Sequence, residues 1–370
     1  MSIRSQIGTF ALALTLGLGL TSGCDAPSAD ESQGDRTQAD FTSYAGKMPN
    51  GPGLYIHNAK EPNHFGISTP EGWFYMTHFA NSAPDIQVHG AFVVGSSLDK
   101  RIGRVVNAEL GGTSYAVKAI SATGSSLELT LVDPITAASF LLSGDKMSEL
   151  RLHVQLPIPG KSRDSRSYSL FFKSPEKVDS VTGELMGFTV FTQLDNVPGA
   201  PMVPYCMRDD LGGTPEAVMV TPSSSWDMPT SARVDDTRIV NLSCVSGAIG
   251  TCERWGYRPW EKAELAASGL SMSLREGHQA CIYMKRADYC GTGDTYTEDG
   301  TMIGISDAYN PGFQKSDSTK REAIWGKSGA RCLDMQRHPD MPIPAACAAT
   351  LPPCTAASYG SDWYVESQVM

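Results

Sequence analysis

The sequence predicts a mainly β protein with a small α+β part: an antiparallel β sandwich or barrel in the N-terminal half, followed by a disulfide-rich C-terminal domain. Three observations support this prediction. Between residues 150 and 158, Leu, Val and Ile alternate with Arg, His, Gln and Pro, which is the period of a strand with one buried face. Short strand-like segments recur from 44 to 204. Every cysteine except Cys24 follows residue 205.

The N-terminus is predicted to carry an export signal. Arg4 precedes an apolar run from 7 to 20, which ends in Thr21-Ser22-Gly23-Cys24. The run is too short to span a bilayer and has the charged start and small-residue exit of a signal peptide, here 1–23. Its ending resembles a bacterial lipobox, which predicts lipidation at Cys24. The lipobox prefers Leu where this chain has Thr21, so secretion with cleavage nearby is the alternative.

The segment 24–43 is predicted to be an acidic disordered tether. Residues 25–40 contain five acids, one base and no large apolar side chain. Such a segment cannot bury enough surface to offset the entropy of ordering. We expect it to hold the folded part away from the membrane.

The net charge of −10 limits the choice of partners. A negative surface is repelled by phosphate backbones and by anionic lipid headgroups. We therefore expect no nucleic-acid partner. Membrane association should come from acyl chains on Cys24, and the remaining partners are a glycan or another envelope protein.

The segment 44–204 is predicted to be a β-rich domain. Alternating residues around Gly124 predict a hairpin formed by 117–121 and 127–131. Further strands are expected at 75–79, 86–94, 101–110, 169–172 and 188–193. Their short, regular spacing favours an antiparallel sandwich or barrel.

The segment 205–370 is predicted to mix strands with helices. A proline near its start and a glycine at its end mark 259–269 as a helix. A second helix is expected at 276–289, because Ala280, Tyr283, Met284 and Ala287 follow helical spacing. Segments 295–297 and 301–306 are predicted to form a hairpin.

The cysteines predict covalent crosslinks in an oxidising compartment. An even set in one half of an exported chain indicates up to four disulfides, and Cys347 with Cys354 is the local pair that we expect. Zinc sites usually contain close Cys-x-x-Cys pairs, which this chain lacks, so we expect no metal and no other cofactor. The set comprises Cys206, Cys244, Cys252, Cys281, Cys290, Cys332, Cys347 and Cys354.

The tetrapeptide Ala287-Asp288-Tyr289-Cys290 and its surroundings resemble a family of exported bacterial proteins, the ADYC domain family. The resemblance covers about 205–332 and implies export and a cysteine framework, but no biochemical activity. It rests on cysteines, tryptophans and glycines in the same order, in Tyr205-Cys206, Ser225-Trp226-Asp227, Asn241 to Cys244, Gly250 to Cys252, Gly256 to Trp260, His278 to Cys281, Arg286 to Gly291, Glu322 to Gly326 and Gly329 to Cys332.

Two residues are candidates for acid/base chemistry. Helical spacing can place His278, Cys281 and Asp288 on one face, the pattern of an activated thiolate, but a disulfide at Cys281 is favoured over a free thiol. His278 is favoured as a structural histidine. Asp288 is favoured as a structural clamp to Arg254, Arg258 or Arg286 over a general base.

A group of aromatic and basic residues is the candidate ligand contact. Trp255, Tyr257, Arg258 and Trp260 lie within six positions and could stack on sugar rings or grip an acidic polymer. The alternative is that these tryptophans pack around the cystines of the domain.

These features together predict an exported protein of the cell envelope, anchored by lipid to the inner or outer membrane. We expect a non-catalytic binding or structural module. The alternative is a hydrolase acting on envelope polymers or glycans, with His278 and Asp288 as its acid and base.

Overall fold

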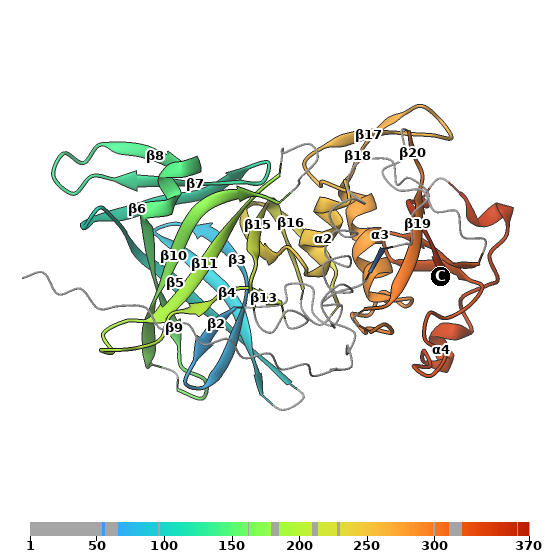
Figure 1. Cartoon of the computed structure of the whole chain (residues 1–370), viewed down its shortest axis with the longest axis horizontal. Coiled ribbons are helices and arrows are strands. Elements are labelled where there is room, and N and C mark those ends of the chain that lie inside the picture. Colours follow the sequence, from blue (N-terminus) through green and yellow to red (C-terminus); the bar gives the residue numbers. More distant parts are fainter. Residues whose placement is uncertain are drawn as a thin grey trace, which may run out of the picture.

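The computed structural model describes a barrel joined to an α+β part (Figure 1). The predicted signal peptide (1–23), the tether (24–43) with Cys24, and the start of the segment 44–204 lie outside the described residues. The described ranges are 54–55, 66–94, 97–161, 163–178, 185–208, 214–227, 230–298, 300–310, 320–360 and 362–369.

Eight antiparallel strands close the barrel. The ring runs β3–β4–β5–β9–β10–β11–β15–β16 and returns from β16 to β3. The prediction of an antiparallel sandwich or barrel is therefore confirmed, in the form of a barrel, although two of its strands, β15 and β16, come from the segment 205–370 and not from 44–204. The strands are β3 (Gly72–Ser82), β4 (Asp85–Val94), β5 (Ser97–Leu110), β9 (Leu150–Pro157), β10 (Ser165–Lys177), β11 (Met186–Leu194), β15 (Ala217–Trp226) and β16 (Arg233–Cys244).

Alternation along the strands fills the interior of the barrel. In β9, Leu150, Leu152, Val154 and Leu156 are buried, while the residues between them are half-buried. They join one apolar cluster with residues such as Phe74 from the other strands. Burial of each such side chain contributes about 1.5–3 kcal/mol.

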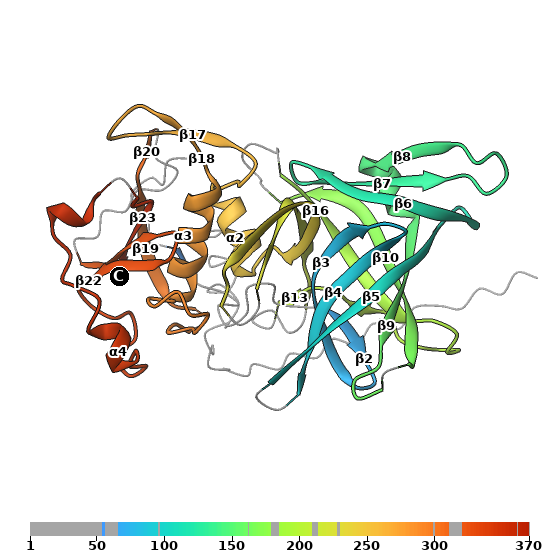
Figure 2. The ribbon, with the colours of Figure 1, turned by 180° about the vertical axis from the view of Figure 1, so that it is seen from behind.

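A three-stranded arm continues from β5 and projects beside the barrel (Figures 1 and 2). It contains the predicted hairpin of 117–121 and 127–131, which the structure confirms. A short 3-10 helix, η1 (Gly144–Glu149), returns the chain to β9. The arm strands are β6 (Thr113–Thr123), β7 (Ser126–Val132) and β8 (Ser139–Ser143).

Four short strands complete this half. β2 (Ile67–Thr69) pairs with β3, and β12 (Val203–Pro204) pairs with β11. β13 (Met207–Arg208) and β14 (Thr214–Pro215) form a separate two-stranded ribbon.

The α+β part places two helices between the barrel and a five-stranded sheet (Figure 1). The helices are α2 (Ala248–Arg254) and α3 (Arg275–Arg286). The sheet has the order β1–β19–β23–β21–β22, so the early strand β1 pairs with a late one. Its strands are β1 (Leu54–Tyr55), β19 (Met302–Asp307), β21 (Arg321–Gly326), β22 (Gly329–Leu333) and β23 (Val365–Val369).

The remaining elements lie at the edges of the α+β part. β17 (Lys262–Leu265) pairs with β18 (Ser271–Ser273) and with β20 (Tyr309–Asn310). A short helix, α4 (Ala345–Ala348), and a 3-10 helix, η3 (Ala356–Ser358), precede β23.

The structure corrects two local predictions. The segment 259–269 is not a helix, because residues 262–265 form β17 and use their backbone groups to pair with two strands. The hairpin predicted for 295–306 is half right. Its second segment is β19, but that strand pairs with β1 and β23, and residues 295–298 form no strand.

The second predicted helix is confirmed as α3. The helix ends at Arg286, and Ala287 adopts a left-handed conformation with φ of 51°. Among the described residues, no helix has the length and apolar character needed to cross a bilayer.

Candidate functional site

The candidate site is a cleft that opens where β16 leaves β3. These strands pair only from Ile239 to Asn241. Beyond that point the β15–β16 hairpin runs on by itself, with an irregularity between Pro222 and Ser224. The space between the hairpin and strands β3, β4 and β5 is a cavity of about 390 Å³. This volume lies within the range of small-molecule sites.

Two stacked histidines line this cleft. The rings of His78 on β3 and His89 on β4 have centroids 4.4 Å apart and planes 13° apart. Thr77 donates its hydroxyl proton to the carbonyl of His89 at 3.1 Å, and its Oγ1 lies 3.0 Å from Nδ1 of His78. A hydroxyl has one proton, so Nδ1–H of His78 must donate to Thr77.

The second ring has a fixed tautomer as well. Nε2 of His89 lies 2.8 Å from Oε1 of Gln87, an oxygen that can only accept. Nε2 of His89 therefore carries the proton. Each imidazole is left with one acceptor nitrogen, Nε2 on His78 and Nδ1 on His89.

Burial keeps both imidazoles neutral. Desolvation lowers the pKa of His78 to about 4, assisted by His89 and opposed by the charge of Asp236. Desolvation also lowers the pKa of His89. At neutral pH the pair therefore offers hydrogen-bond acceptors and carries no positive charge.

Charged groups at the rim of the cleft are paired. Nζ of Lys100 on β5 lies 2.9 Å from Oδ1 of Asp227 at the end of β15, so this ion pair joins the two walls. Thr230 donates a hydrogen bond to the other oxygen of Asp227 at 2.9 Å. Arg101 forms two contacts of 2.9 Å with Asp99.

The remaining lining is apolar and partly exposed. Ile102 is 54% exposed and Val234 is 49% exposed, although both are large aliphatic residues. Trp226 forms part of the wall but is itself buried, and its indole N–H donates to Gln279 of α3. The cleft thus combines acceptor nitrogens, an apolar surface and compensated charges.

A second cavity, of about 370 Å³, includes Ala232 and Arg233 of the β15–β16 hairpin in its lining. It is lined by residues of α3 and of the β21–β22 turn, including Glu276, Gln279 and Lys327. Lys327 and Glu276 form an ion pair at 3.0 Å. His278 and Asp288, the predicted acid/base candidates, are not among its lining residues.

His278 is a core residue of α3. Its side chain is fully buried, packs edge-on against Trp226 and contacts the carbonyl of Ile249 through Nε2 at 3.1 Å. Desolvation lowers its pKa to about 3. A neutral imidazole held by a backbone carbonyl acts as a packing group, in agreement with the favoured structural interpretation.

Asp288 is also fully buried and clamps the loop after α3. Its oxygens accept hydrogen bonds from the backbone N–H groups of Thr292 at 3.0 Å and Gly293 at 2.7 Å. Desolvation raises its pKa to about 6, against the opposing effects of these bonds and of Arg286. The carboxylate therefore holds the backbone of this loop, and of the three arginines named as its candidate partners, Arg286 acts on it through its charge.

The aromatic group lies mostly inside the protein. Trp255 and Tyr257 are at most 1% exposed and belong to the same apolar cluster as Cys252 and Cys281. Arg258 is buried and contacts Glu261 at 3.1 Å. Trp260 is half-buried near the turn at Gly124. The structure therefore brings this group together as packing around a cystine and leaves only Trp260 partly accessible.

All eight cysteines of the C-terminal half form disulfides. The predicted pair Cys347–Cys354 is wrong, because each of these residues reaches a partner on another element. Cys347 in α4 joins the loop after α3, and Cys354 joins β22. The pairs are Cys206–Cys244, Cys252–Cys281, Cys290–Cys347 and Cys332–Cys354.

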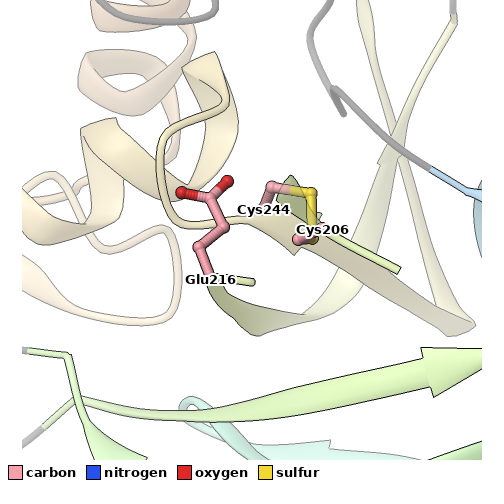
Figure 3. Close-up of side chains that lie close together, drawn as sticks. All are labelled: Cys206, Glu216 and Cys244. Atoms are coloured by element: carbon pink, nitrogen blue, oxygen red, sulfur yellow. A yellow bond between two sulfur atoms is a disulfide. The ribbon is translucent and has the colours of Figure 1, made fainter. Parts of the chain in front are cut away.

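Glu216 lies beside the first of these disulfides (Figure 3). Its carboxylate and the sulfurs of Cys206 and Cys244 lie within 4.8 Å of one another. The sulfurs are bonded to each other, so neither is a thiolate ligand. Glu216 accepts a hydrogen bond of 2.5 Å from Ser246 instead.

A polar seam connects the barrel to the helices. Thr221 of β15 donates a hydrogen bond of 2.5 Å to Glu253 of α2. Complete burial raises the pKa of Glu253 to about 8, opposed by this bond and by Arg258. Lys285 of α3 donates to the carbonyl of Ser246 and to Thr251 at 2.5 Å each.

Another cluster, on the barrel, contains serine, histidine and aspartate but lacks the geometry of a hydrolase. Ser169 Oγ and Asp195 both contact Nδ1 of His153, at 3.1 and 3.0 Å. A catalytic triad needs the nucleophile and the acid on opposite ring nitrogens. Ser169 is also fully buried.

Each residue of the tetrapeptide 287–290 has a structural role. Ala287 ends α3, Asp288 clamps the following loop and Cys290 anchors α4 through its disulfide. Tyr289 donates a hydrogen bond of 2.7 Å to Glu322, which pairs with the buried Arg337. These contacts tie α3 to the sheet of the α+β part.

The fold and these sites define a class of disulfide-bonded β proteins, in which a closed barrel is joined to an α+β part that is crosslinked by disulfides. The sequence model of the ADYC domain matches residues 138–339 of this chain. The chain therefore belongs to the ADYC domain family, and the match begins well before residue 205, the start of the resemblance in the sequence motifs. No curated protein and no solved structure matches the chain significantly.

Sequence reasoning did not identify the cleft. Its lining comes from segments 77–102 and 225–239, which are distant in the sequence. The one available signal was the pair of histidines, His78 and His89, on consecutive predicted strands. The sequence does not give the register between β3 and β4, so it does not predict that the two rings stack.

Proposed function

We propose that this protein is a lipid-anchored module of the bacterial cell envelope that binds a small ligand in the cleft and catalyses no reaction. The cleft is the observation that carries the proposal. It is concave, partly apolar and lined by a few polar groups with defined hydrogen-bonding capacity, which is the composition of a binding site.

Export to an oxidising compartment is supported by the four disulfides. The lipid anchor rests on the sequence that ends at Cys24. An acyl chain contributes about 0.8 kcal/mol per buried methylene, so a negatively charged protein can be held at a membrane without a basic patch.

The anchor can be tested by metabolic labelling with an alkyne fatty acid in a bacterial host. We expect the wild-type protein to incorporate the label and to sediment with membranes. Cys24→Ser should do neither. An unlabelled wild-type protein recovered in the soluble secreted fraction would refute the anchor.

The binding role can be tested with glycan and cell-wall polymer arrays. Val234→Asp places a charge in the cleft at an exposed position, so folding should be retained. Val197→Asp is the matched control, because Val197 is also 49% exposed and lies outside the cleft. We expect binding by the wild type and the control but not by Val234→Asp. Equal binding by all three proteins would exclude the cleft.

Trp260→Ala tests the ligand contact that was predicted from sequence. Trp260 is the accessible member of the aromatic group. If only this variant loses binding, the ligand binds at the aromatic group and not in the cleft.

A further inference from the structure

The ligand class can be inferred from the hydrogen-bonding state of the cleft, given the proposed function. The contacts with Thr77 and Gln87 leave both histidines with an acceptor nitrogen. A partner for these nitrogens must donate hydrogen bonds. Hydroxyl and amide groups do so without bringing a charge into the cleft.

A metal ion is a poor match for the same nitrogens. Their lone pairs lie in the ring planes, and those planes are only 13° from parallel. Lone pairs in nearly parallel, stacked planes do not converge on one point. A single ion could therefore not be bound by both rings at coordination distance.

The charges of the cleft do not favour an ionic ligand. Lys100 is paired with Asp227, and Arg101 is paired with Asp99. The two histidines are neutral. The charges of these pairs largely compensate one another, so a charged ligand would find little net opposite charge in the cleft, whereas a neutral molecule needs none.

The apolar part of the cleft lining favours a ligand that also has an apolar surface. Ile102 and Val234 line the cleft and are 54% and 49% exposed. A ring with C–H groups on its faces and hydroxyls on its edge could cover these side chains and still donate to the histidines.

We infer that the cleft binds a neutral, hydroxyl-bearing ring compound of the size of one or two sugar units, whose hydroxyls donate to His78 and His89 and whose C–H face covers Ile102 and Val234. This inference rests on the proposed function and specifies its ligand.

The test uses the purified protein with ¹⁵N-labelled histidine and long-range ¹⁵N–¹H NMR spectra, which distinguish the two nitrogens of each ring. The probes are glucose, N-acetylglucosamine, cellobiose and N,N′-diacetylchitobiose, with glucuronate and zinc chloride as charged comparisons. We expect the free protein to carry the proton on Nδ1 of His78 and on Nε2 of His89.

We expect at least one neutral sugar to shift the acceptor nitrogens of both rings. Val234→Asp should raise its Kd at least about tenfold, and Val197→Asp should leave it within about twofold. A double variant, Lys100→Met with Asp227→Asn, should keep the Kd within about threefold, because the ion pair is not a ligand group.

Three outcomes would overturn the ligand class. They are shifts caused by glucuronate alone, shifts caused by zinc alone, or no shift with any probe. The proposed function is tested separately, by the polymer arrays. If Val234→Asp loses binding to an envelope polymer, the cleft is the binding site, even if none of the small sugars shifts the histidine signals.

Discussion

Nη2 of Arg337 lies 3.0 Å from Oε2 of Glu322, and neither side chain is more than 1% exposed. Tyr289 donates to the other oxygen of Glu322, and Arg337 also donates to the carbonyl of Met284 at 2.8 Å. This ion pair therefore connects the end of α3 with β21. Its removal should affect the whole α+β part.

We predict that Glu322→Gln lowers the free energy of unfolding by about 3–5 kcal/mol, because it leaves a buried guanidinium without its counter-charge. Urea unfolding followed by tryptophan fluorescence measures this loss. Asp164→Asn is the control, since its partner Lys161 and Asp164 itself are about 60% exposed. Equal unfolding midpoints for Glu322→Gln and the wild type would contradict the role of the pair.

Removal of the disulfide between α2 and α3 should also lower the free energy of unfolding. Cys252 and Cys281 are separated by 29 positions, and a crosslink of that span stabilises by about 3–4 kcal/mol in the chain-entropy account. The double variant Cys252→Ala/Cys281→Ala should lose that amount in urea unfolding.

The pairing of the other cysteines can be tested by peptide mapping of the wild-type protein without reduction. This mapping should recover Cys290 joined to Cys347, and a Cys347–Cys354 peptide would contradict the structure.

Glu253 should make stability depend on pH. Its pKa is about 8 in the folded protein, above the ordinary value of 4.5, so the folded state binds the proton more tightly than the unfolded state. Its contribution is therefore present below about pH 4.5 and is lost as the pH rises to about 8. Relative to the wild type, Glu253→Gln should gain stability across this window. A constant difference between the two proteins from pH 5 to 8 would refute the assignment.

Gly277 should not tolerate a side chain. A Cβ atom there would lie 2.1 Å from the hydroxyl oxygen of Tyr309, which is buried against the start of α3. We predict that Gly277→Ala costs about 1–3 kcal/mol. Tyr309→Phe in the same chain should recover part of the loss, and thermal unfolding of both single variants and the double variant measures the coupling. Additive losses would argue against this contact.

Asp288→Asn should lower stability, because the amide offers one acceptor where the carboxylate offers two to Thr292 and Gly293. We expect a loss of about 1–3 kcal/mol. Asp164→Asn is again the control, because Asp164 is about 60% exposed and, among the described residues, makes no contact with this loop. Chemical denaturation at pH 7.5 checks the difference, and an unchanged midpoint in Asp288→Asn would exclude the clamp.

Much of the fold followed from local patterns. The alternation around Leu152 predicted strands, and the spacing of Tyr283 and Met284 predicted α3, because burial of one face leaves a periodic signal. The helix predicted for 259–269 failed for a physical reason. Its intrinsic preference is weaker than the hydrogen bonds that residues 262–265 gain by pairing with two strands.

The candidate site was less predictable, because it depends on contacts between distant segments. Nothing local indicates that Val234 and Ile102 line the same cleft, or that Asp227 contacts Lys100 across 127 positions. The ligand contact predicted from the aromatic composition of 255–260 also lies mostly inside the protein. Trp255 and Tyr257 have the chemistry of a sugar contact, but the same chemistry suits the core around a cystine, and the sequence does not distinguish these environments.

The return of β16 to β3 has a practical consequence for fragment work. A recombinant piece ending at residue 204 would lack the two strands that complete the ring, so β3 around 78–80 and β11 around 188–189 would lose their backbone partners. Bare edges of this kind recruit other chains. Such a piece should precipitate on expression, and supplying residues 205–370 in trans should restore its solubility by fragment complementation.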